Sequence, residues 1–373
     1  MGPTTSVNQA GRLREIDGWR AICALLVLFD HVGANQHAHL FSRVDGLIPL
    51  VDLWGQLGVK IFFVISGFVI CRLLIVEEQR DGFVSLRGFY YRRATRILAP
   101  FYAYLATVSL LSFYGLIYSS WRAILSSALF LYDINHVSPS SRFVAHTWSL
   151  AVEEQFYLLF PTIFILTAKR RRIAASLAVV LFTVAWNLST VFSSWDPITS
   201  ARTREGFACI SFGVLIAVCE VRARDIAKRA PALFVALGAL VLLLHPVRSS
   251  GLLNAAYESL LVPPTIGLLL VFSLERGPLF RRILCCKPVQ ALGVTSYGIY
   301  LWQELFSAPK VFIDSFGAEQ NFSRAGQLIP SLLPLMLVIV PLSYFLIEKP
   351  AMRMGKSLSR GAKVRASSKV CVS

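Results

Sequence analysis

Ten apolar segments, separated by polar and mostly basic connections, are the feature that most limits the folds open to this chain. Its mean hydropathy is +0.60, and only 16% of its residues are charged. A backbone inside hydrocarbon must satisfy its own hydrogen bonds, so such segments cross a membrane as helices. The sequence therefore predicts an all-α integral membrane bundle of about ten transmembrane helices. The segments are 20–36, 57–76, 97–117, 147–168, 173–193, 206–220, 231–247, 254–274, 291–309 and 329–347.

The basic residues give this bundle an orientation. A net charge of +16 can indicate nucleic-acid binding, but most of the 37 lysines and arginines lie in connections on one side of the predicted membrane. The positive-inside rule makes that side, which also carries both termini, cytoplasmic. The apolar segment 121–133 is too short for a crossing and is expected to be re-entrant or interfacial. Membrane lipid, and no nucleic acid, is therefore the expected partner of these charges.

The first segment, Asp17–Asn35, carries Arg20, Asp30 and His31. Arg20 and His31 are eleven residues apart, which is close to three helical turns and about 16 Å along the axis. Both side chains then share one helix face, with Arg20 at a membrane surface and His31 near mid-bilayer. A histidine at that depth needs a partner, a water-filled cavity or a function. The alternative is a packed histidine bonded to a neighbouring helix.

Two adjacent carboxylates lie near the start of the fourth segment. Glu153 and Glu154 would lie about 10 Å below the outer face, and His31 about 14 Å below it. A carboxylate that orients an imidazole is a common general-base arrangement. Adjacent helical residues point about 100° apart, so one glutamate at most would face His31.

Arg93 and Arg96 are three residues apart at the cytoplasmic end of the third segment, and they share a helix face. Paired guanidiniums suit a phosphorylated ligand, because each can bind phosphate oxygens with two hydrogen bonds. The alternative is a role in orientation and lipid headgroup contact. The sequence has no glycine-rich nucleotide fingerprint. Its seven cysteines do not have the spacing of a zinc site or disulfide framework, so no metal site is predicted.

Together these motifs resemble the acyltransferase 3 family, membrane acyltransferases that O-acylate sugars and other hydroxyl compounds. The resemblance covers nearly the whole chain and rests on the order and spacing of several short motifs. They are Asp17–Arg20 with His31, Gly58–Phe68, Tyr91–Arg96, Trp148–Tyr157, Ser296–Trp302 and Glu348–Pro350.

The resemblance implies transfer of an acyl group, usually acetyl, from cytoplasmic acyl-CoA to an acceptor at the outer side. His31 matches the essential histidine of the family, and Arg20 matches the arginine of the same motif. Arg93 and Arg96 match paired arginines that hold the phosphates of coenzyme A, and Arg20 is expected to bind this cofactor with them. Glu153 matches a glutamate that relatives keep after Trp-Ser-Leu, and it is expected to be catalytic together with His31. The implied location is a bacterial inner membrane, and the implied acceptor is a sugar, polysaccharide or lipid-linked glycan.

One departure from the family concerns the position after Trp302. Many relatives have histidine there, whereas this chain has Gln303 followed by Glu304. Any catalytic role of that family histidine therefore does not transfer to this chain.

The expected chemistry uses His31 as the general base that takes the proton of an acceptor hydroxyl. Attack on the thioester carbonyl builds negative charge on oxygen, and that charge requires a hydrogen-bond donor. Tyr300 and Trp302 are candidate donors, and Trp148 and Glu154 are further candidates for contact with substrate. Direct transfer is the preferred route, and an acyl-histidine intermediate is the alternative.

Two other functions remain open at this stage. A proton-coupled transporter or flippase could use the same histidine, glutamate and arginines as a relay, and a silent family member could act in assembly. Domain boundaries are expected at a disordered segment 1–11, a transmembrane acyltransferase domain 12–350, and a basic disordered tail 351–373. The length predicts a stand-alone type without an additional hydrolase-like domain. The acceptor and the oligomeric state are not specified by the sequence.

Overall fold

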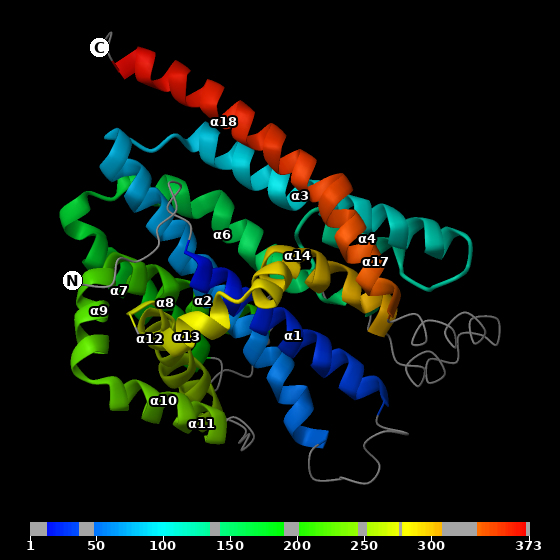
Figure 1. Ribbon diagram of the computed structural model, residues 1–373, viewed down its shortest axis with the longest axis horizontal. Coiled ribbons are helices and arrows are strands. Elements are labelled where there is room, and N and C mark those ends of the chain that lie inside the picture. The colour runs from blue at the N-terminus through cyan, green and yellow to red at the C-terminus, as the bar shows by residue number, and fades with distance from the viewer. Residues whose placement is uncertain are drawn as a thin grey trace.

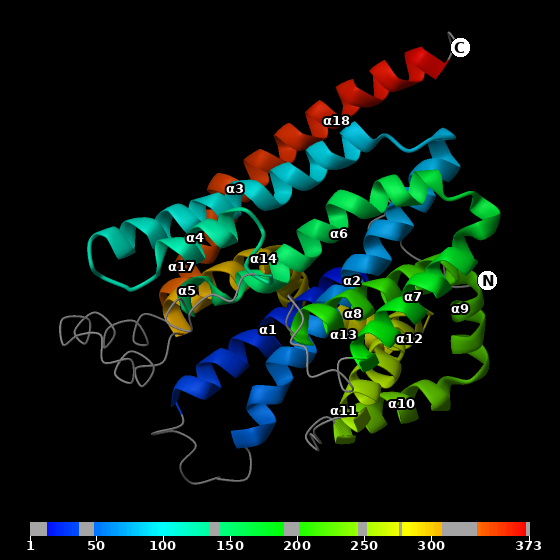
Figure 2. The ribbon, with the colours of Figure 1, turned by 180° about the vertical axis from the view of Figure 1, so that it is seen from behind.

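The structure is a computed structural model that describes residues 13–36, 48–134, 142–189, 201–244, 252–275, 278–307 and 334–370. Within these ranges every regular element is helical, and Figures 1 and 2 show them from opposite sides. The elements are α1 (Arg14–Gln36), α2 (Ile48–Asp81), α3 (Leu86–Phe113), α4 (Trp121–Ala128), α5 (Arg142–Ala145), α6 (Thr147–Leu166), η1 (Lys169–Arg171), α7 (Arg172–Ser189), α8 (Ala201–Val218), α9 (Glu220–Arg229), α10 (Pro231–Leu244), α11 (Leu252–Ala256), η2 (Tyr257–Leu261), α12 (Val262–Glu275), α13 (Pro278–Leu284), α14 (Lys287–Ser307), α17 (Met336–Ser343), η4 (Tyr344–Glu348) and α18 (Lys349–Val370).

The chain is an all-α polytopic membrane bundle, as the apolar segments predict. Among the described residues, five helices are long and apolar enough to cross a membrane. They are α2 from Trp54, α3, α5 with α6, η1 with α7, and α11 through α12. The bent pair α8 and α9, with an 85° angle between its halves, makes a sixth if it is one span. The predicted total of ten crossings stays a prediction.

The predicted re-entrant or interfacial segment 121–133 contains the short helix α4. Its eight residues extend about 12 Å at 1.5 Å per residue, which is too short for the hydrocarbon core. Ser120 caps the helix by accepting a hydrogen bond from the backbone N–H of Ala123.

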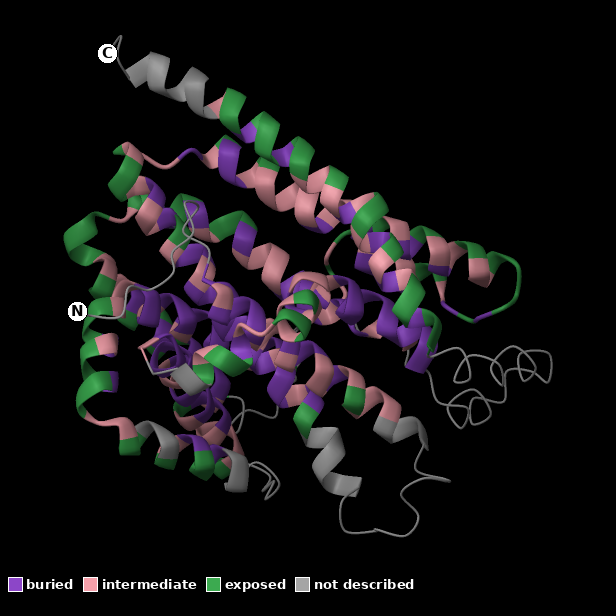
Figure 3. Ribbon diagram, in the orientation of Figure 1, coloured by how far each residue is buried: buried purple, intermediate pink, exposed green. Residues whose placement is uncertain are grey.

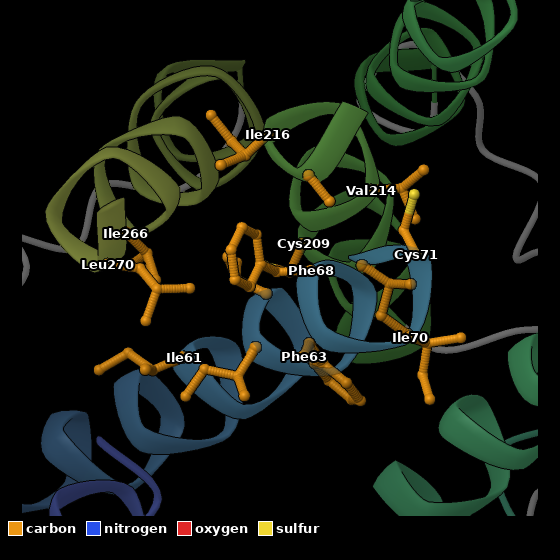
Figure 4. Close-up of a cluster of buried hydrophobic side chains, with 14 of the residues drawn as sticks. Ile61, Phe63, Phe68, Ile70, Cys71, Cys209, Val214, Ile216, Ile266 and Leu270 are labelled. Atoms are coloured by element: carbon orange, nitrogen blue, oxygen red, sulfur yellow. The ribbon is translucent and has the colours of Figure 1, made fainter. Parts of the chain in front are cut away.

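Helices α1, α2, α8, α12 and α14 form the centre of the bundle, where α2 packs along α8 and α1 packs between α2 and α14. Figure 3 shows that buried residues concentrate there, whereas α9 and the outer part of α18 carry many exposed residues. An apolar cluster joins α2, α8 and α12, with Phe63, Phe68, Val214 and Leu270 among its members (Figure 4). Burial of these side chains stabilises the helix packing behind the candidate site.

Glycines set the closest helix contacts. A Cβ atom at Gly67 of α2 would lie 2.1 Å from the carbonyl oxygen of Ile210, and one at Gly213 would lie 2.2 Å from that of Val64. Small residues let membrane helices approach at backbone distance. On the other side of α1, Gly293 of α14 is packed against its backbone in the same way. These contacts fix α1, α2, α8 and α14 relative to one another.

The structure differs from the prediction of a disordered tail from residue 351. Helix α18 continues to Val370 and packs along α3, and Figures 1 and 2 show the two side by side. Small residues explain this contact, because a Cβ at Gly355 would lie 2.0 Å from Thr95 Oγ1. One turn later Ser359 accepts a hydrogen bond from Arg92. The predicted disordered segment 1–11 and the last residues, 371–373, lie outside the described residues.

The α3–α18 contact gives a first prediction. We expect Gly355→Leu to separate α18 from α3, because the new side chain overlaps Thr95. Trypsin should then cleave at the basic residues of α18 several-fold faster than in the wild type. Gly361→Leu is the matched control, because a Cβ there meets nothing within 4 Å. Equal cleavage rates for the two variants would contradict the packing role of Gly355.

Candidate active site

His31 of α1 forms an ion pair with a residue of α14. Its Nε2 lies 2.9 Å from Glu304 Oε1, and its Nδ1 lies 2.8 Å from the carbonyl oxygen of Val27. A carbonyl only accepts hydrogen bonds, so Nδ1 carries a proton. A bond between Nε2 and a carboxyl oxygen needs a second proton, held by either group. The two side chains therefore share one ionisable proton.

The Glu304 side chain is almost fully buried and lies between two cationic groups. Its second oxygen, Oε2, is 3.7 Å from Arg142 Nε of the short helix α5. An unpaired carboxylate at this depth would be very costly, and His31 and Arg142 offset that cost. Two helices and the start of a third thus converge on one carboxylate.

His31 and Glu304 line a cavity of about 660 Å³, which is a common size for a small-molecule site. Aromatic, acidic and basic side chains from α1, α2, α6, α8 and α14, and from the connections before α5 and α6, complete its wall. The polar and aromatic lining residues are Asp30, Gln56, Lys60, Phe63, Tyr132, Asp133, His146, Trp148, Arg202, Glu205 and Tyr300. His31 thus faces a cavity and has a charged partner, two of the features that a histidine near mid-bilayer was expected to need.

The connection after α4 supplies Tyr132 and Asp133 to the cavity wall. Gln155 Nε2 donates a hydrogen bond to Asp133 Oδ1 over 3.0 Å. Burial raises the pKa of the Asp133 carboxyl, and the Gln155 hydrogen bond opposes part of that rise. Burial also raises the pKa of Tyr132 to about 12, so its hydroxyl stays protonated at neutral pH. Both groups offer hydrogen bonds to a ligand in the cavity.

Of the residues predicted to contact the oxyanion or the substrate, some line the cavity and others do not. Trp148 lines the cavity with its ring edge-on to Phe63, and Tyr300 also lines it. The Tyr300 hydroxyl lies 3.0 Å from the carbonyl oxygen of His146 and 2.5 Å from Ser149 Oγ. The single proton of the Tyr300 hydroxyl is therefore already engaged in one of these hydrogen bonds. Trp302 is not part of the cavity lining, and its ring packs edge-on against Tyr104.

The prediction that Glu153 pairs with His31 is wrong in this structure. Glu153 accepts hydrogen bonds from Ser66 over 2.6 Å and from Tyr157 over 3.2 Å, and it lines a second, smaller cavity. The neighbouring Glu154 lies within the electrostatic influence of Arg93. Helix depth alone does not fix the direction in which a side chain points, and α6 turns Glu153 toward α2.

The predicted coenzyme A residues do lie together. Arg96 interacts with the like charges of Arg20 and Arg93, and the Arg93 guanidinium lies 3.7 Å from the ring centre of Tyr157. The Nε atoms of Arg20 and Arg93 are buried, with no hydrogen-bond partner among the described residues. Three guanidiniums from two helices, with unused donors, are suited to bind an anion.

The arginine cluster and the His31 cavity are close neighbours. Arg20 and Glu153 line the smaller cavity, of about 50 Å³. Val59, Phe63 and Tyr300 line both cavities, so these three side chains form the wall between them. Arg20 and His31 therefore line two adjoining cavities and lie about 16 Å apart along α1.

Several lining residues were missed by sequence reasoning. Glu304 was noted only as a departure from the family, and Lys60 only as part of a motif. Lys60 forms ion pairs with Glu205 of α8 and Glu258 of η2. A lysine inside an apolar segment was the available signal, whereas nothing in the sequence near Glu205 pointed to it.

Comparison with known proteins identifies the family of the whole chain. A family model described as an acyltransferase domain of the acyltransferase 3 type matches residues 13–348. The chain belongs to the acyltransferase 3 family. Among curated proteins the chain is similar to YrhL of Bacillus subtilis (strain 168), to which it is 26% identical over 380 residues, covering 92% of this chain and 56% of YrhL. No solved structure matches the chain significantly.

Two further relatives carry functional names. The peptidoglycan O-acetyltransferase OatA of Listeria monocytogenes is 24% identical over 388 residues, covering 91% of this chain and 56% of OatA. The O-acetyltransferase OatA of Staphylococcus aureus (strain NCTC 8325 / PS 47) is 25% identical over 375 residues, covering 91% and 57%. This acyltransferase 3 chain thus spans just over half the length of the curated relatives it matches.

Proposed function

We propose that this chain is a membrane O-acetyltransferase that moves an acetyl group from cytoplasmic acetyl-CoA to a hydroxyl of a glycan. The observation that carries the proposal is the pair formed by the half-buried His31 and the buried Glu304 on the wall of a large cavity with several polar side chains. An imidazole that shares a proton with a carboxylate can take a proton from a hydroxyl or return one in acid–base catalysis. Family membership supplies the reaction class.

The acceptor is proposed from chemistry and from the relatives. Both OatA proteins are named as O-acetyltransferases, one of them as acting on peptidoglycan. A cavity with aromatic rings beside carboxylates and amides suits a polyhydroxylated ring better than an apolar ligand. We therefore propose a carbohydrate or glycolipid acceptor at the outer face of a bacterial inner membrane.

The donor end is proposed at Arg20, Arg93 and Arg96. Coenzyme A carries several phosphates, and guanidiniums with unused donors bind such groups in charge-assisted pairs. Its flexible pantetheine arm extends from the phosphates, so it can carry the thioester from this cluster toward His31. The wall formed by Val59, Phe63 and Tyr300 would have to admit it.

The reaction is proposed as direct transfer. The acceptor oxygen attacks the thioester carbonyl, His31 takes the hydroxyl proton, and the C–S bond breaks to release coenzyme A as its thiol. His31 Nδ1 donates to the Val27 carbonyl, so Nε2 is the atom that takes the hydroxyl proton once it has lost its own. Incubation with labelled acetyl-CoA and no acceptor tests this route, because an isolated acetyl-enzyme would refute direct transfer.

The donor site gives a second prediction. We expect Arg93→Ala and Arg96→Ala each to weaken acetyl-CoA binding by about tenfold or more, because a charge-assisted hydrogen bond contributes about 1.5–3 kcal/mol. Binding of radiolabelled acetyl-CoA to purified protein measures this effect. Arg80→Ala is the control, since that arginine is exposed and pairs with Asp81. Equal affinity for acetyl-CoA in all three variants would mean that Arg93 and Arg96 act in membrane orientation and lipid headgroup contact instead.

Mass spectrometry of cell-surface glycans tests the proposal as a whole. Cells that express the chain should carry acetyl esters that matched cells without it lack. If purified protein neither binds nor consumes acetyl-CoA and no ester changes, the transporter alternative replaces the enzyme.

A further inference from the structure

A second charged cluster consists of Lys60, Glu205 and Glu258 and lies where α2 and α8 line the His31 cavity. The proposed chemistry does not use it. Lys60 Nζ lies 3.1 Å from Glu205 Oε2 and forms a closer ion pair with Glu258. The exposed fractions of Lys60 and Glu258 are only 6% and 2%. Glu205 and Lys60 line the cavity that His31 and Glu304 also line. One cavity therefore contains two separate charged sites.

The three charges of this cluster do not balance. One ammonium faces two carboxylates, so the cluster itself has one carboxylate more than it has cations, and Arg202 lines the same cavity. A buried ion pair of this kind contributes little to stability, because desolvation costs about as much as the attraction returns. An excess buried carboxylate is costlier still. A purely structural role thus explains the cluster poorly.

The two glutamates have different roles, because only Glu205 lines the cavity. Glu258 lies in η2, a π-helical turn, and is not among the lining residues. Asn187 holds that turn by donating to Ser259 Oγ over 2.6 Å. Glu205 is 17% exposed and uses only its Oε2 toward Lys60. Glu258 thus anchors the ammonium, and Lys60 in turn fixes a carboxylate that faces the cavity.

The surroundings of Glu205 indicate the ligand class. Trp148 and Phe63 form an aromatic surface on the same cavity, and Gln56 adds an amide. A fixed carboxylate accepts hydrogen bonds from neighbouring hydroxyls, and an aromatic ring packs against the C–H face of a sugar.

We infer that Glu205, held by Lys60, binds the hydroxyls of the acceptor sugar next to the one that reacts, and so selects which oxygen meets His31. This inference rests on the proposed O-acetyltransferase function. Glu205 is a binding residue here, and Lys60 is a positioning residue. The ligand class is a sugar ring with neighbouring free hydroxyls.

The test compares Glu205→Gln with Glu205→Asp and with the control Glu220→Gln. Glu220 pairs with Arg72 and Arg224 and is not among the residues lining the cavity. Two quantities are measured: binding of radiolabelled acetyl-CoA to purified protein, and acetyl esters on the glycans of cells with matched expression. The positions of the esters on each sugar are determined as well.

We expect Glu205→Gln to lower glycan acetylation about tenfold, to spread the residual esters over several hydroxyls, and to leave acetyl-CoA binding unchanged. Glu205→Asp should recover part of the selectivity, and Glu220→Gln should match the wild type. Wild-type levels and positions of esters in Glu205→Gln would overturn the inference. So would a joint loss of acetylation and acetyl-CoA binding, which indicates a structural role. Failure of the wild type to bind acetyl-CoA would instead refute the proposed function.

Discussion

Replacing His31 with alanine should lower acetyl transfer by at least about 100-fold, since a positioned general base contributes about 10²–10⁴-fold. The variant loses the group that takes the hydroxyl proton, and it leaves Arg142 as the one charged partner of Glu304 among the described residues. Binding of acetyl-CoA should change little, because Arg20, the arginine of the same helix, lines the other cavity.

Two measurements separate loss of chemistry from loss of fold in this variant. Size-exclusion chromatography and acetyl-CoA binding report on folding, and glycan mass spectrometry at matched expression reports on transfer. Transfer within a few-fold of the wild type would remove His31 from the mechanism. Loss of acetyl-CoA binding together with transfer would mean that the ion pair with Glu304 holds the bundle together.

The relation between Arg20 and His31 was predictable because it lies within one helix. Helical rise and turn fix both distance and direction over eleven residues, so the spacing alone predicted a shared face. The structure keeps that relation and places the two residues on different cavities, with Tyr300 between them. The same reasoning correctly grouped Arg93 with Arg96.

The partner of His31 was not predictable, because it depends on how separate helices pack. Glu153 lies at a suitable depth, but its carboxylate accepts from Ser66 and Tyr157. Glu304 comes from a helix nearly three hundred residues away in sequence, brought close by the contact of Gly293 with the backbone of α1. Rotation of each helix about its axis is set by such contacts.

Charges hidden in apolar segments were the most informative signal that the sequence carried. His31 and Lys60 each stand inside an apolar run, and each proves to be paired with a carboxylate on the same cavity. Polar groups at such depth are costly unless paired, so their partners follow from energetics even where their identity does not. The tail shows the reverse case. Its basic composition predicted disorder, and a few small residues let it pack as α18.

The ion pair also limits how His31 can act. While Nε2 and Glu304 share a proton, Nε2 has no free lone pair for a hydroxyl. The base form appears only when that proton leaves, and the remaining carboxylate charge is then offset by Arg142 alone. The transfer rate of the wild type should therefore rise with pH until the pair has lost its proton.

We expect Glu304→Gln to lower transfer by about 100-fold and to move this rising part of the pH profile to lower pH. Loss of the carboxylate charge lets His31 release its proton more easily, and loss of the fixed partner leaves the ring less well oriented. Acetyl transfer by purified protein over a range of pH measures both effects. Gln303→Asn, which changes the residue of α14 next to Glu304, is the control. An unchanged profile would mean that Glu304 does not act on His31.

The double variant His31→Ala with Glu304→Gln gives the sharpest test of the pair. If Glu304 acts only through His31, the double variant should transfer acetyl groups as slowly as His31→Ala and no more slowly. Independent roles would multiply the two losses. A multiplied loss would therefore assign Glu304 a contact with substrate of its own, whereas equal rates would make it the residue that positions His31.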